Sequence, residues 1–419
     1  MGQAKDYYKL IALSAVGSCF ELFDFLSFIF LSSILSRVFF PFHDKSQGLI
    51  YTFIIFSTGY FFRPVGGILL AHFGDRYGRK LIFILTLLLM SLPSLIIALM
   101  PVTRQIGIAA PILLALMRMT QGISLGGEVA GSVTYVAEFT SERWRTFACS
   151  LMTASANAGV LLVALVVSVL TNALSAEQMT AFGWRIPFLT GAALGLTAVY
   201  LRKRFSETPL FLEIQNKHHI QKVPLAYVWK HYRPSLLFGF SLAIIVSSST
   251  STFHLFFPSY LTDFLNFKMR DVVLVSSAGI AALAIFSPLF ALASMYIGRQ
   301  RQCMAGASLL IMLCAAAAYN NYGTGTLVDA YIFIVLVSLA IALVNSVMMA
   351  MLADLFPTCV RFTGVALSYN LGCLVGAGLT PMINTYCIHA TGYLNTPFAL
   401  VAIFAALASL AMVFHAKAA

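Results

Sequence analysis

Apolar stretches of about 20 residues recur along the whole of this chain, with short polar interruptions between them. About 20 residues of α-helix cross the hydrocarbon core of a bilayer, so each stretch predicts a transmembrane helix. The composition agrees, because 60% of the residues are hydrophobic and only 10% are charged. The predicted spans are 10–36, 49–73, 80–100, 108–138, 146–173, 183–202, 234–262, 271–297, 302–319, 327–353, 360–388 and 394–415. We therefore expect an all-α membrane protein with twelve transmembrane helices.

The longest interruption, residues 203–233, separates two groups of six predicted helices. This basic region carries Arg202, Lys203, Arg204, Lys217, Lys222, Lys230 and Arg233. Since Lys and Arg concentrate in cytoplasmic loops, it should lie in the cytoplasm. We predict an N-terminal six-helix bundle over residues 1–202, a cytoplasmic central loop over 203–233 and a C-terminal six-helix bundle over 234–419.

The formal net charge of +11 reports on topology. If both termini are cytoplasmic, roughly 18 Lys and Arg face the cytoplasm and roughly six face the other side. These residues are spread over many short loops, which argues against a nucleic-acid surface. The first apolar stretch is too long and too charged for a cleaved signal peptide. We expect a multi-pass protein of a prokaryotic inner membrane, in contact with lipid and monomeric.

Enzymatic chemistry finds no support in the sequence. The seven cysteines are scattered and have neither metal-ligand nor disulfide-framework spacing. No nucleotide-binding loop, metal cluster or nucleophile constellation is readable. We expect no enzyme activity, no cofactor and no metal, so an ion gradient must supply any energy.

The two halves of the chain echo each other. Glu138 precedes Arg145 by seven residues, and Asp354 precedes Arg361 by the same spacing at the end of the corresponding helix. The two copies are 216 residues apart, which indicates a duplicated six-helix unit. Parallel halves around a central site are typical of transporters.

A second echo follows the second helix of each half. Residues 74–80 read Gly-Asp-Arg-Tyr-Gly-Arg-Lys, and a weaker copy is Gly298 to Arg301, with Tyr296 and Ile297 where a charged residue would be expected. The first loop resembles the signature of the major facilitator superfamily. The resemblance implies a rocker-switch carrier with a cytoplasmic gate. The residues assigned to that gate are Gly74, Asp75, Arg76, Gly78, Arg79, Glu138, Arg145, Asp354 and Arg361.

Further motifs narrow the resemblance. They are Glu21-Leu22-Phe23-Asp24-Phe25, Arg63-Pro64-Val65-Gly66-Gly67, Arg118-Met119-Thr120-Gln121-Gly122, Gly126-Gly127-Glu128, Gly183 to Phe188, Glu207-Thr208-Pro209-Leu210-Phe211 and Phe356 to Asn370. Together they resemble the metabolite:proton symporter family, which includes α-ketoglutarate, citrate, shikimate and proline/betaine carriers. Leu22 and Phe23 depart from the family's usual aromatic pair, so the rings along the solute path differ.

Five ionisable residues interrupt the apolar stretches of the first third of the chain: Glu21, Asp24, Arg63, Arg118 and Glu128. A charge at bilayer depth costs at least about 2.5 kcal/mol, so such residues normally face a protein-lined cavity and mark an ion or solute route. We assign proton coupling to Asp24 and Glu128 first, then to Glu21 and Arg118. Arg63 and Arg118 are also candidates to bind a solute carboxylate. The alternative is a fixed internal network of salt bridges.

The second half offers neutral polar groups instead. A Ser/Thr run at residues 247–252 precedes His254, and Asn345, Tyr369 and Asn370 lie in later helices. His254, Asn345, Tyr369 and Asn370 are candidates to hydrogen-bond a solute. The alternative for the serines and threonines is a bond to their own backbone, which is common in membrane helices.

These observations predict a proton-coupled symporter that imports a mono-, di- or tricarboxylate or a zwitterionic osmolyte by alternating access. The alternative on the same fold is a proton-driven exporter of drugs or metabolites, siderophore-like polycarboxylates included. A sensor that binds a nutrient without moving it would need a signalling domain, and the central loop is short against typical domains of about 50 residues or more. No charged ring or carbonyl filter indicates a channel, and coupling to sodium stays open.

Overall fold

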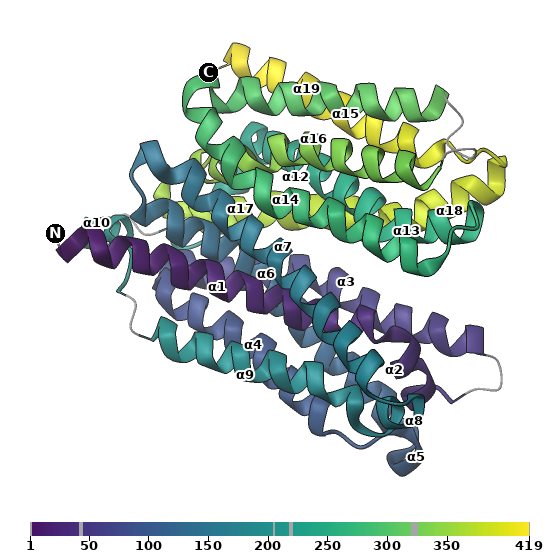
Figure 1. Cartoon of the computed structure of the whole chain (residues 1–419). Coiled ribbons are helices and arrows are strands. Elements are labelled where there is room, and N and C mark those ends of the chain that lie inside the picture. Colours follow the sequence, from purple (N-terminus) through teal and green to yellow (C-terminus); the bar gives the residue numbers. More distant parts are fainter. Residues whose placement is uncertain (1, 42–44, 204–205, 218–220, 320–325, 419) are drawn as a thin grey trace. The chain divides into compact units, whose positions relative to one another are not determined.

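The computed structural model describes residues 2–41, 45–203, 206–217, 221–319 and 326–418 (Figure 1). Almost all of these residues are helical, and none of them forms a strand. Arg204 of the predicted basic loop lies outside the described residues.

Every predicted span has a helical counterpart. In the first half these are α1 (Gly2–Phe30) with α2 (Ser32–Phe39), α3 (Lys45–Tyr77), α4 (Arg79–Leu99), α6 (Ala109–Phe139), α7 (Glu142–Ala173) and α9 (Arg185–Arg202). In the second half they are α12 (Arg233–Thr250) with its continuation to Phe264, α14 (Met269–Ile297), α15 (Arg299–Tyr319), α16 (Leu327–Asp354), α17 (Arg361–Cys373) with α18 (Thr380–Thr391), and α19 (Thr396–Ala418). Short connecting helices are α5 (Thr103–Ile106), α8 (Ala176–Gln178), α10 (Pro209–Asn216) and α11 (Pro224–His231).

The long helices can be judged as membrane spans by their length and their apolar composition. Among the described residues, ten helical segments are long and apolar enough to cross a membrane. The two other long helices are α6, with 31 residues, and α15, with 21. α6 carries three charged residues, Arg118, Glu128 and Glu138, and they lower its mean hydropathy.

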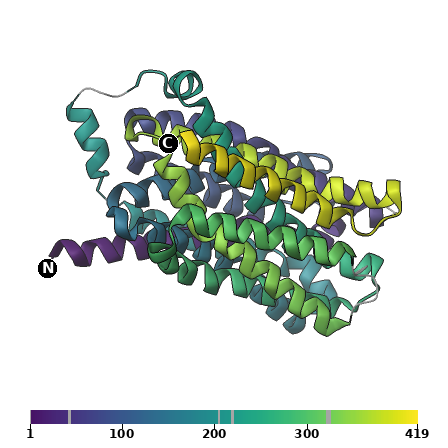
Figure 2. The same cartoon turned by 90° about the horizontal axis from the view of Figure 1, so that it is seen from above.

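The chain clusters into two compact units. Unit 1 comprises Met1–Phe139 and Ser155–Pro224, and unit 2 comprises Thr140–Ala154 and Leu225–Ala419. Within each unit the long helices run alongside one another (Figures 1 and 2). The first turns of α7 therefore group with unit 2, whereas the rest of that helix belongs to unit 1. This clustering differs from the division expected from hydropathy, which stays a prediction.

Glycines bring α3 and α6 of unit 1 into backbone contact. A Cβ at Gly122 would overlap the backbone of Gly59, and one at Gly66 would overlap that of Ile123. Small residues allow such close helix approach in membranes, where packing replaces the hydrophobic effect as the driving force. α4 packs on both α6 and α9, and α1 packs on α9. The buried charges of α1, α3 and α6 are thus held in one unit.

Unit 2 contains π-helical turns, which hydropathy did not predict. They are η2 (Ser251–Phe256), η3 (Tyr260–Phe264) and η6 (Leu374–Leu379). Ser251 Oγ donates to the carbonyl of Ala377 in η6 at 3.1 Å, and Ser247 Oγ donates to that of Gly372 at 2.9 Å. Part of the serine run therefore joins two helices through their backbones. Such turns are frequent at functional sites.

The repeated loops share their backbone geometry. Gly78 and Gly298 have positive φ values of 117° and 89°, and each immediately precedes a 21-residue helix, α4 or α15. Glycine reaches this conformation without the steric cost that a Cβ would add. With the two glycines matched, Met295 stands at the position of Asp75, and Tyr296 at that of Arg76. The counterpart of the acid Asp75 is thus Met295, one residue before the positions Tyr296 and Ile297 where a charged residue was expected.

Candidate functional site

Asp24 is at the end of a chain of hydrogen bonds in unit 1. Its carboxylate is 1% exposed and accepts from Ser94 Oγ of α4, at 2.6 Å to Oδ1 and 2.5 Å to Oδ2. Ser94 Oγ in turn accepts from Gln121 Nε2 of α6 at 2.7 Å. Gly191 of α9 lies against the carboxylate so closely that a Cβ there would overlap it. Helices α4 and α9 thus contact this acid of α1, and α6 is linked to it through Ser94.

Arg118 continues the chain from the other side. Its Nη1 donates to Gln121 Oε1 at 2.7 Å and to the carbonyl of Phe25 at 3.2 Å. The fully buried guanidinium also lies over the rings of Phe25, Phe28 and Phe56, at 4.2, 4.7 and 5.2 Å from their centroids. Such cation–π contacts gain strength when the cation is desolvated. We name these three rings the ring seat of Arg118.

Asp24 and Arg118 were both predicted to take part in coupling, and they lie in the same chain of contacts. They do not form an ion pair within 4.0 Å in the described part of the protein. Ser94 and Gln121 lie between them instead. These two residues were missed because neutral polar side chains in membrane helices usually bond to their own backbone.

Glu128 belongs to a second buried group. Its Oε1 lies 2.6 Å from Arg202 Nη2 and its Oε2 lies 3.0 Å from Arg202 Nη1. Thr86 also donates to Oε2. Arg202 Nη1 donates to the carbonyl of Phe83 at 2.8 Å, and the guanidinium lies 3.3 Å from the centroid of that ring. A bidentate pair of this kind fixes both geometry and charge.

The position of Arg202 differs from the prediction. It was counted with the basic residues of the cytoplasmic stretch, whereas the structure buries it to 1% exposure at the last residue of α9. The long side chain turns into unit 1, where Gly17 leaves room for its guanidinium. A residue at the end of an apolar span thus belongs to the core, because its partner Glu128 is buried.

Glu21 is the buried acid with an unsatisfied oxygen. It is 3% exposed, and its Oε1 has no hydrogen-bond partner among the described residues. It interacts electrostatically with Glu128, Arg63 and Arg202. Arg63 itself is 7% exposed on α3, which continues past Pro64. A buried carboxylate without full hydrogen bonding is costly in its charged form, so Glu21 suits a site that exchanges protons.

The predicted gate residues of unit 1 come together around Arg79. Its guanidinium lies 3.0 Å from Asp75 Oδ1 and 3.3 Å from Glu138 Oε2, and its Nη1 donates to the carbonyl of Gly74 at 3.2 Å. All three charged side chains are buried. Arg76 does not join them, because it is exposed and lies over the ring of Tyr77.

The Glu207-Thr208-Pro209 motif completes this cluster, a role that the sequence analysis did not assign. Glu207 accepts from the backbone N–H groups of Arg79 and Lys80, each at 3.1 Å, and so caps the start of α4. Thr208 Oγ1 donates to Glu138 Oε2 at 2.6 Å. A carboxylate is stabilising at this end of a helix because the helix dipole is positive there.

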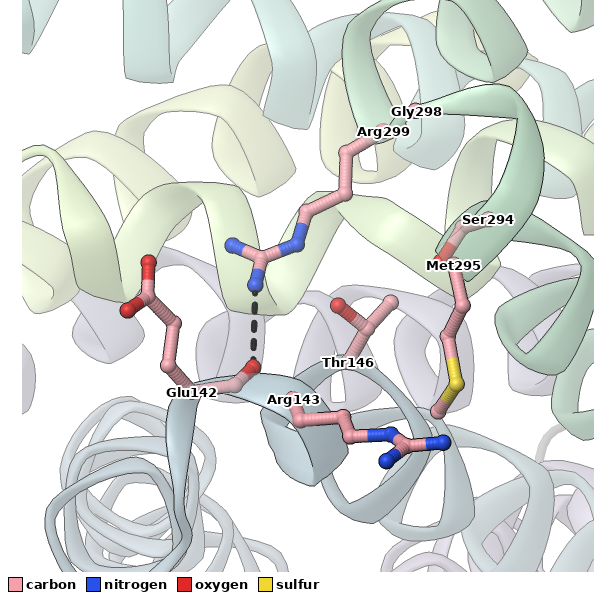
Figure 3. A pocket seen from close by; sticks show the side chains of 7 residues that line it. All are labelled: Glu142, Arg143, Thr146, Ser294, Met295, Gly298 and Arg299. Atoms are coloured by element: carbon pink, nitrogen blue, oxygen red, sulfur yellow. Dashed lines mark hydrogen bonds between the residues drawn. The ribbon is translucent and has the colours of Figure 1, made fainter.

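Asp354 is the acceptor for two arginines in unit 2. Arg145 Nη1 lies 2.5 Å from its Oδ1, and Arg299 pairs with its Oδ2. Arg299 Nη2 also donates to the carbonyl of Glu142 at 3.3 Å, as Figure 3 shows. Arg361 instead donates from Nε to the carbonyl of Ala353 at 2.9 Å. A cavity of about 580 Å³ adjoins this cluster and is lined by Glu142, Arg143, Thr146, Ser294, Met295, Gly298 and Arg299 (Figure 3).

His254 is the most distinctive of the predicted solute contacts in unit 2. It is 7% exposed in η2, and neither ring nitrogen has a hydrogen-bond partner among the described residues. Gly279 of α14 leaves room for its ring. Asn345 and Asn370 are also buried, and Tyr369 is half-buried.

Most serines of the run 247–252 hydrogen-bond to the backbone of their own helix, which was the alternative to binding a solute. Ser247, Ser248 and Ser249 each donate to a backbone carbonyl three or four residues earlier in their own helix. Thr252 accepts from Asn384 Nδ2 at 3.3 Å. In the part of the chain that the structure describes, no group of three or more His, Cys, Asp or Glu side chains is placed to hold a metal ion.

Comparison with known proteins adds independent observations. The family model described as "Major Facilitator Superfamily" matches residues 18–358. The ectoine/proline transporter ProP of Corynebacterium glutamicum is 32% identical over 418 residues, which cover 96% of this chain and 82% of that protein. The proline/betaine transporter of Escherichia coli K12 is 33% identical over 402 residues, covering 93% and 79%.

Solved structures give the same fold. A structure of the proton:xylose symporter XylE superposes with a TM-score of 0.82 at 16% identity and covers 98% of this chain and 96% of its own. A double-tryptophan mutant of XylE gives a TM-score of 0.85. The predicted all-α transporter fold is therefore confirmed.

Proposed function

Since this chain belongs to the major facilitator superfamily, as its motifs predicted, we propose that it is a proton-coupled symporter importing a small zwitterionic or carboxylate solute. It is a multi-pass membrane transporter and not an enzyme. The proposal concerns the coupling ion, the solute and the direction of transport.

The observation that carries the proposal is the buried hydrogen-bond chain that joins Asp24 to Arg118 through Ser94 and Gln121. Asp24 has a neutral hydroxyl donor, and no cation lies within ion-pair distance of it in the described residues. A carboxylate in this setting can exist with or without a proton, unlike Glu128, which is bound bidentately by Arg202. We therefore place coupling at Asp24 first and Glu21 second, and we assign Glu128 to holding the unit together.

The solute class rests on the relatives. The similar proteins are named for proline, betaine and ectoine, and proline and betaine each join a carboxylate to a positively charged nitrogen. Arg63 and Arg118, both buried, are the candidates in unit 1 for the carboxylate. His254, Asn345, Tyr369 and Asn370 are the candidates in unit 2.

The test is uptake into proteoliposomes with and without an inward proton gradient. Labelled proline, betaine and ectoine would be compared with citrate, α-ketoglutarate and shikimate, for the parent protein and Asp24→Asn. We expect accumulation of a zwitterion that needs the gradient and is lost in Asp24→Asn, while solute exchange is retained. Glu213→Gln is the matched control, because that carboxylate is exposed on α10 and pairs with Lys217, just after the end of this helix.

Three outcomes would overturn parts of the proposal. Accumulation that follows a sodium gradient instead would replace the ion. Net transport outward against an opposing proton flow would favour the exporter. Unimpaired gradient-driven accumulation in Asp24→Asn would remove Asp24 from the coupling site.

We also propose that the protein lies in a prokaryotic inner membrane as a monomer with both termini in the cytoplasm. The support is the excess of Lys and Arg that this orientation places inside. The clusters around Arg79 and Asp354 then lie at the cytoplasmic face, as expected for a gate. A C-terminal reporter that works only in the cytoplasm tests the orientation, and an inactive reporter would reverse it.

A further inference from the structure

We propose that Ser94 and Gln121 are positioning residues that link the protonation of Asp24 to Arg118, and that the ring seat stabilises Arg118 away from the acid. The inference rests on the proposed function in one respect: it takes Asp24 as the group that binds the proton.

The direction of the hydrogen bonds is the first argument. Arg118 donates to Gln121, Gln121 donates to Ser94, and Ser94 donates to Asp24. Every donor points toward the carboxylate, which fits an ionised Asp24 because that form accepts only. An amide has a fixed donor end and a fixed acceptor end, so Gln121 holds this direction, whereas the hydroxyl of Ser94 can rotate.

Protonation of Asp24 disturbs the chain at its first link. The carboxyl gains a donor, and the charge-assisted bond from Ser94 becomes a weaker bond between neutral groups. The hydrogen bond between Gln121 and Ser94 then weakens, and so does the bond between Nη1 of Arg118 and Gln121. The protonation state is thereby transmitted from α1 through α4 to α6.

The ring seat is the second argument. Nε and Nη2 of Arg118 have no hydrogen-bond partner among the described residues, and the aromatic faces of Phe25, Phe28 and Phe56 surround the cation instead. Aromatic faces attract a cation without needing a negative charge. Arg118 can therefore stay buried when Asp24 is neutral, which a direct ion pair would not allow at comparable cost.

The electrostatic surroundings leave Arg118 as the principal charged neighbour of Asp24. From α4 the neutral Ser94 contacts the acid, and from α9 Gly191 does. α3 places Tyr60 near Arg118. Glu21, one turn away on α1, interacts with the charges of the second group. At the two ends of α9, Arg202 binds Glu128, and Arg185 donates to the carbonyls of Ala98 and Met100.

The experiment compares the pH dependence of transport in variants of the whole protein. Ser94→Ala and Gln121→Leu remove donors that favour ionised Asp24. The pH of half-maximal proton-driven uptake should therefore rise, by about one to two units for Ser94→Ala if a charge-assisted bond is lost. Phe56→Leu removes one ring of the ring seat, so Arg118 should interact more strongly with the carboxylate of Asp24. Because this favours the ionised form, the pH of half-maximal uptake should fall.

Matched controls remove similar groups outside the chain. Ser91→Ala deletes a buried hydroxyl one turn earlier on α4 that donates to the carbonyl of Leu87. Thr120→Val deletes a hydroxyl beside Gln121 that donates to the carbonyl of Leu116. Phe61→Leu removes an exposed ring from α3. We expect all three to keep the parent profile, and Ser94→Thr to restore it.

A second readout does not depend on turnover. The infrared band of a protonated carboxyl group, assigned through its loss in Asp24→Asn, would be titrated in the purified parent and variants. Shifts of its midpoint that match the transport shifts support the inference. Midpoints that stay at the parent value in Ser94→Ala and Gln121→Leu would overturn it, as would shifts of the same sign in Phe56→Leu. Failure of the proposed function looks different: Asp24→Asn would then leave accumulation intact.

Discussion

The Glu128–Arg202 pair allows a quantitative test of how unit 1 holds its charges. Breaking a buried ion pair by removing one partner costs about 3–5 kcal/mol. In Glu128→Gln, Arg202 still donates to the carbonyl of Phe83, lies over its ring and interacts with Glu21. We therefore expect a cost near the lower limit, about 3 kcal/mol.

Arg202→Met should cost more, although both variants remove the same pair. Glu128 would keep Thr86 as its donor but would face Glu21 with one less cation, so two acids would repel each other. We expect a cost near the upper limit, about 5 kcal/mol. A domain of the size of unit 1 loses about 2–4 °C in melting temperature per kcal/mol. The melting temperature should therefore fall by about 6–12 °C in Glu128→Gln and by about 10–20 °C in Arg202→Met.

The assay is thermal unfolding of the purified protein in detergent, followed by tryptophan fluorescence. The double variant should lose less than the sum of the two single variants, because it leaves no unpaired partner. Lys217→Met is the control, since that pair is exposed on α10. An equal or larger loss in Glu128→Gln, or strict additivity in the double variant, would refute the reasoning.

Three further predictions address packing and the two loop clusters. Gly122→Ala forces a methyl group into the backbone of Gly59 and should cost about 1–3 kcal/mol, with a lower melting temperature, whereas Leu116→Ala on the exposed face of the same helix should not. Glu207→Gln removes the charged cap of α4, and hydrogen exchange should speed up at residues 79–82; unchanged exchange there would count against the cap. Met295→Asp supplies the acid that unit 2 lacks at this position, so exchange over residues 295–302 should slow relative to the isosteric Met295→Asn, and equal rates would contradict an electrostatic effect.

The course of the helices was predictable because it depends on local properties. Twenty apolar residues in sequence are enough to identify a span, and glycine at Gly78 and Gly298 is enough to mark the turn before α4 and α15. The π-helical turns were not predictable in this way. A change from i→i+4 to i→i+5 hydrogen bonding leaves the apolar run intact, so hydropathy carries no sign of it.

The candidate site was only half predictable, for a different reason. Charges such as Asp24 and Arg118 stand out in apolar sequence, but the neutral Ser94 and Gln121 that join them do not. Arg202 shows the opposite error, since a cation at the end of a span looks like a loop residue until its partner is known. Partners are set by packing between distant segments, and a single sequence does not encode that packing in any local pattern.

The turns at Gly78 and Gly298 share a backbone conformation, but the charged side chains around them differ. In unit 1, Arg79 is buried between Asp75 and Glu138, and Glu207 caps the helix that it begins. In unit 2, the matching Arg299 shares the exposed Asp354 with Arg145, and both arginines are half-exposed.

Buried charges with several partners are costly to separate, whereas half-exposed pairs are screened by solvent and separate easily. The cluster of unit 1 is therefore suited to remain intact while the protein changes conformation. The cluster of unit 2, which also fixes the first turns of α7 through Glu142 and Arg145, is suited to open and close. Under the proposed function, the loop of unit 1 therefore serves as a permanent joint and the loop of unit 2 as a reversible contact, with the same backbone turn in both.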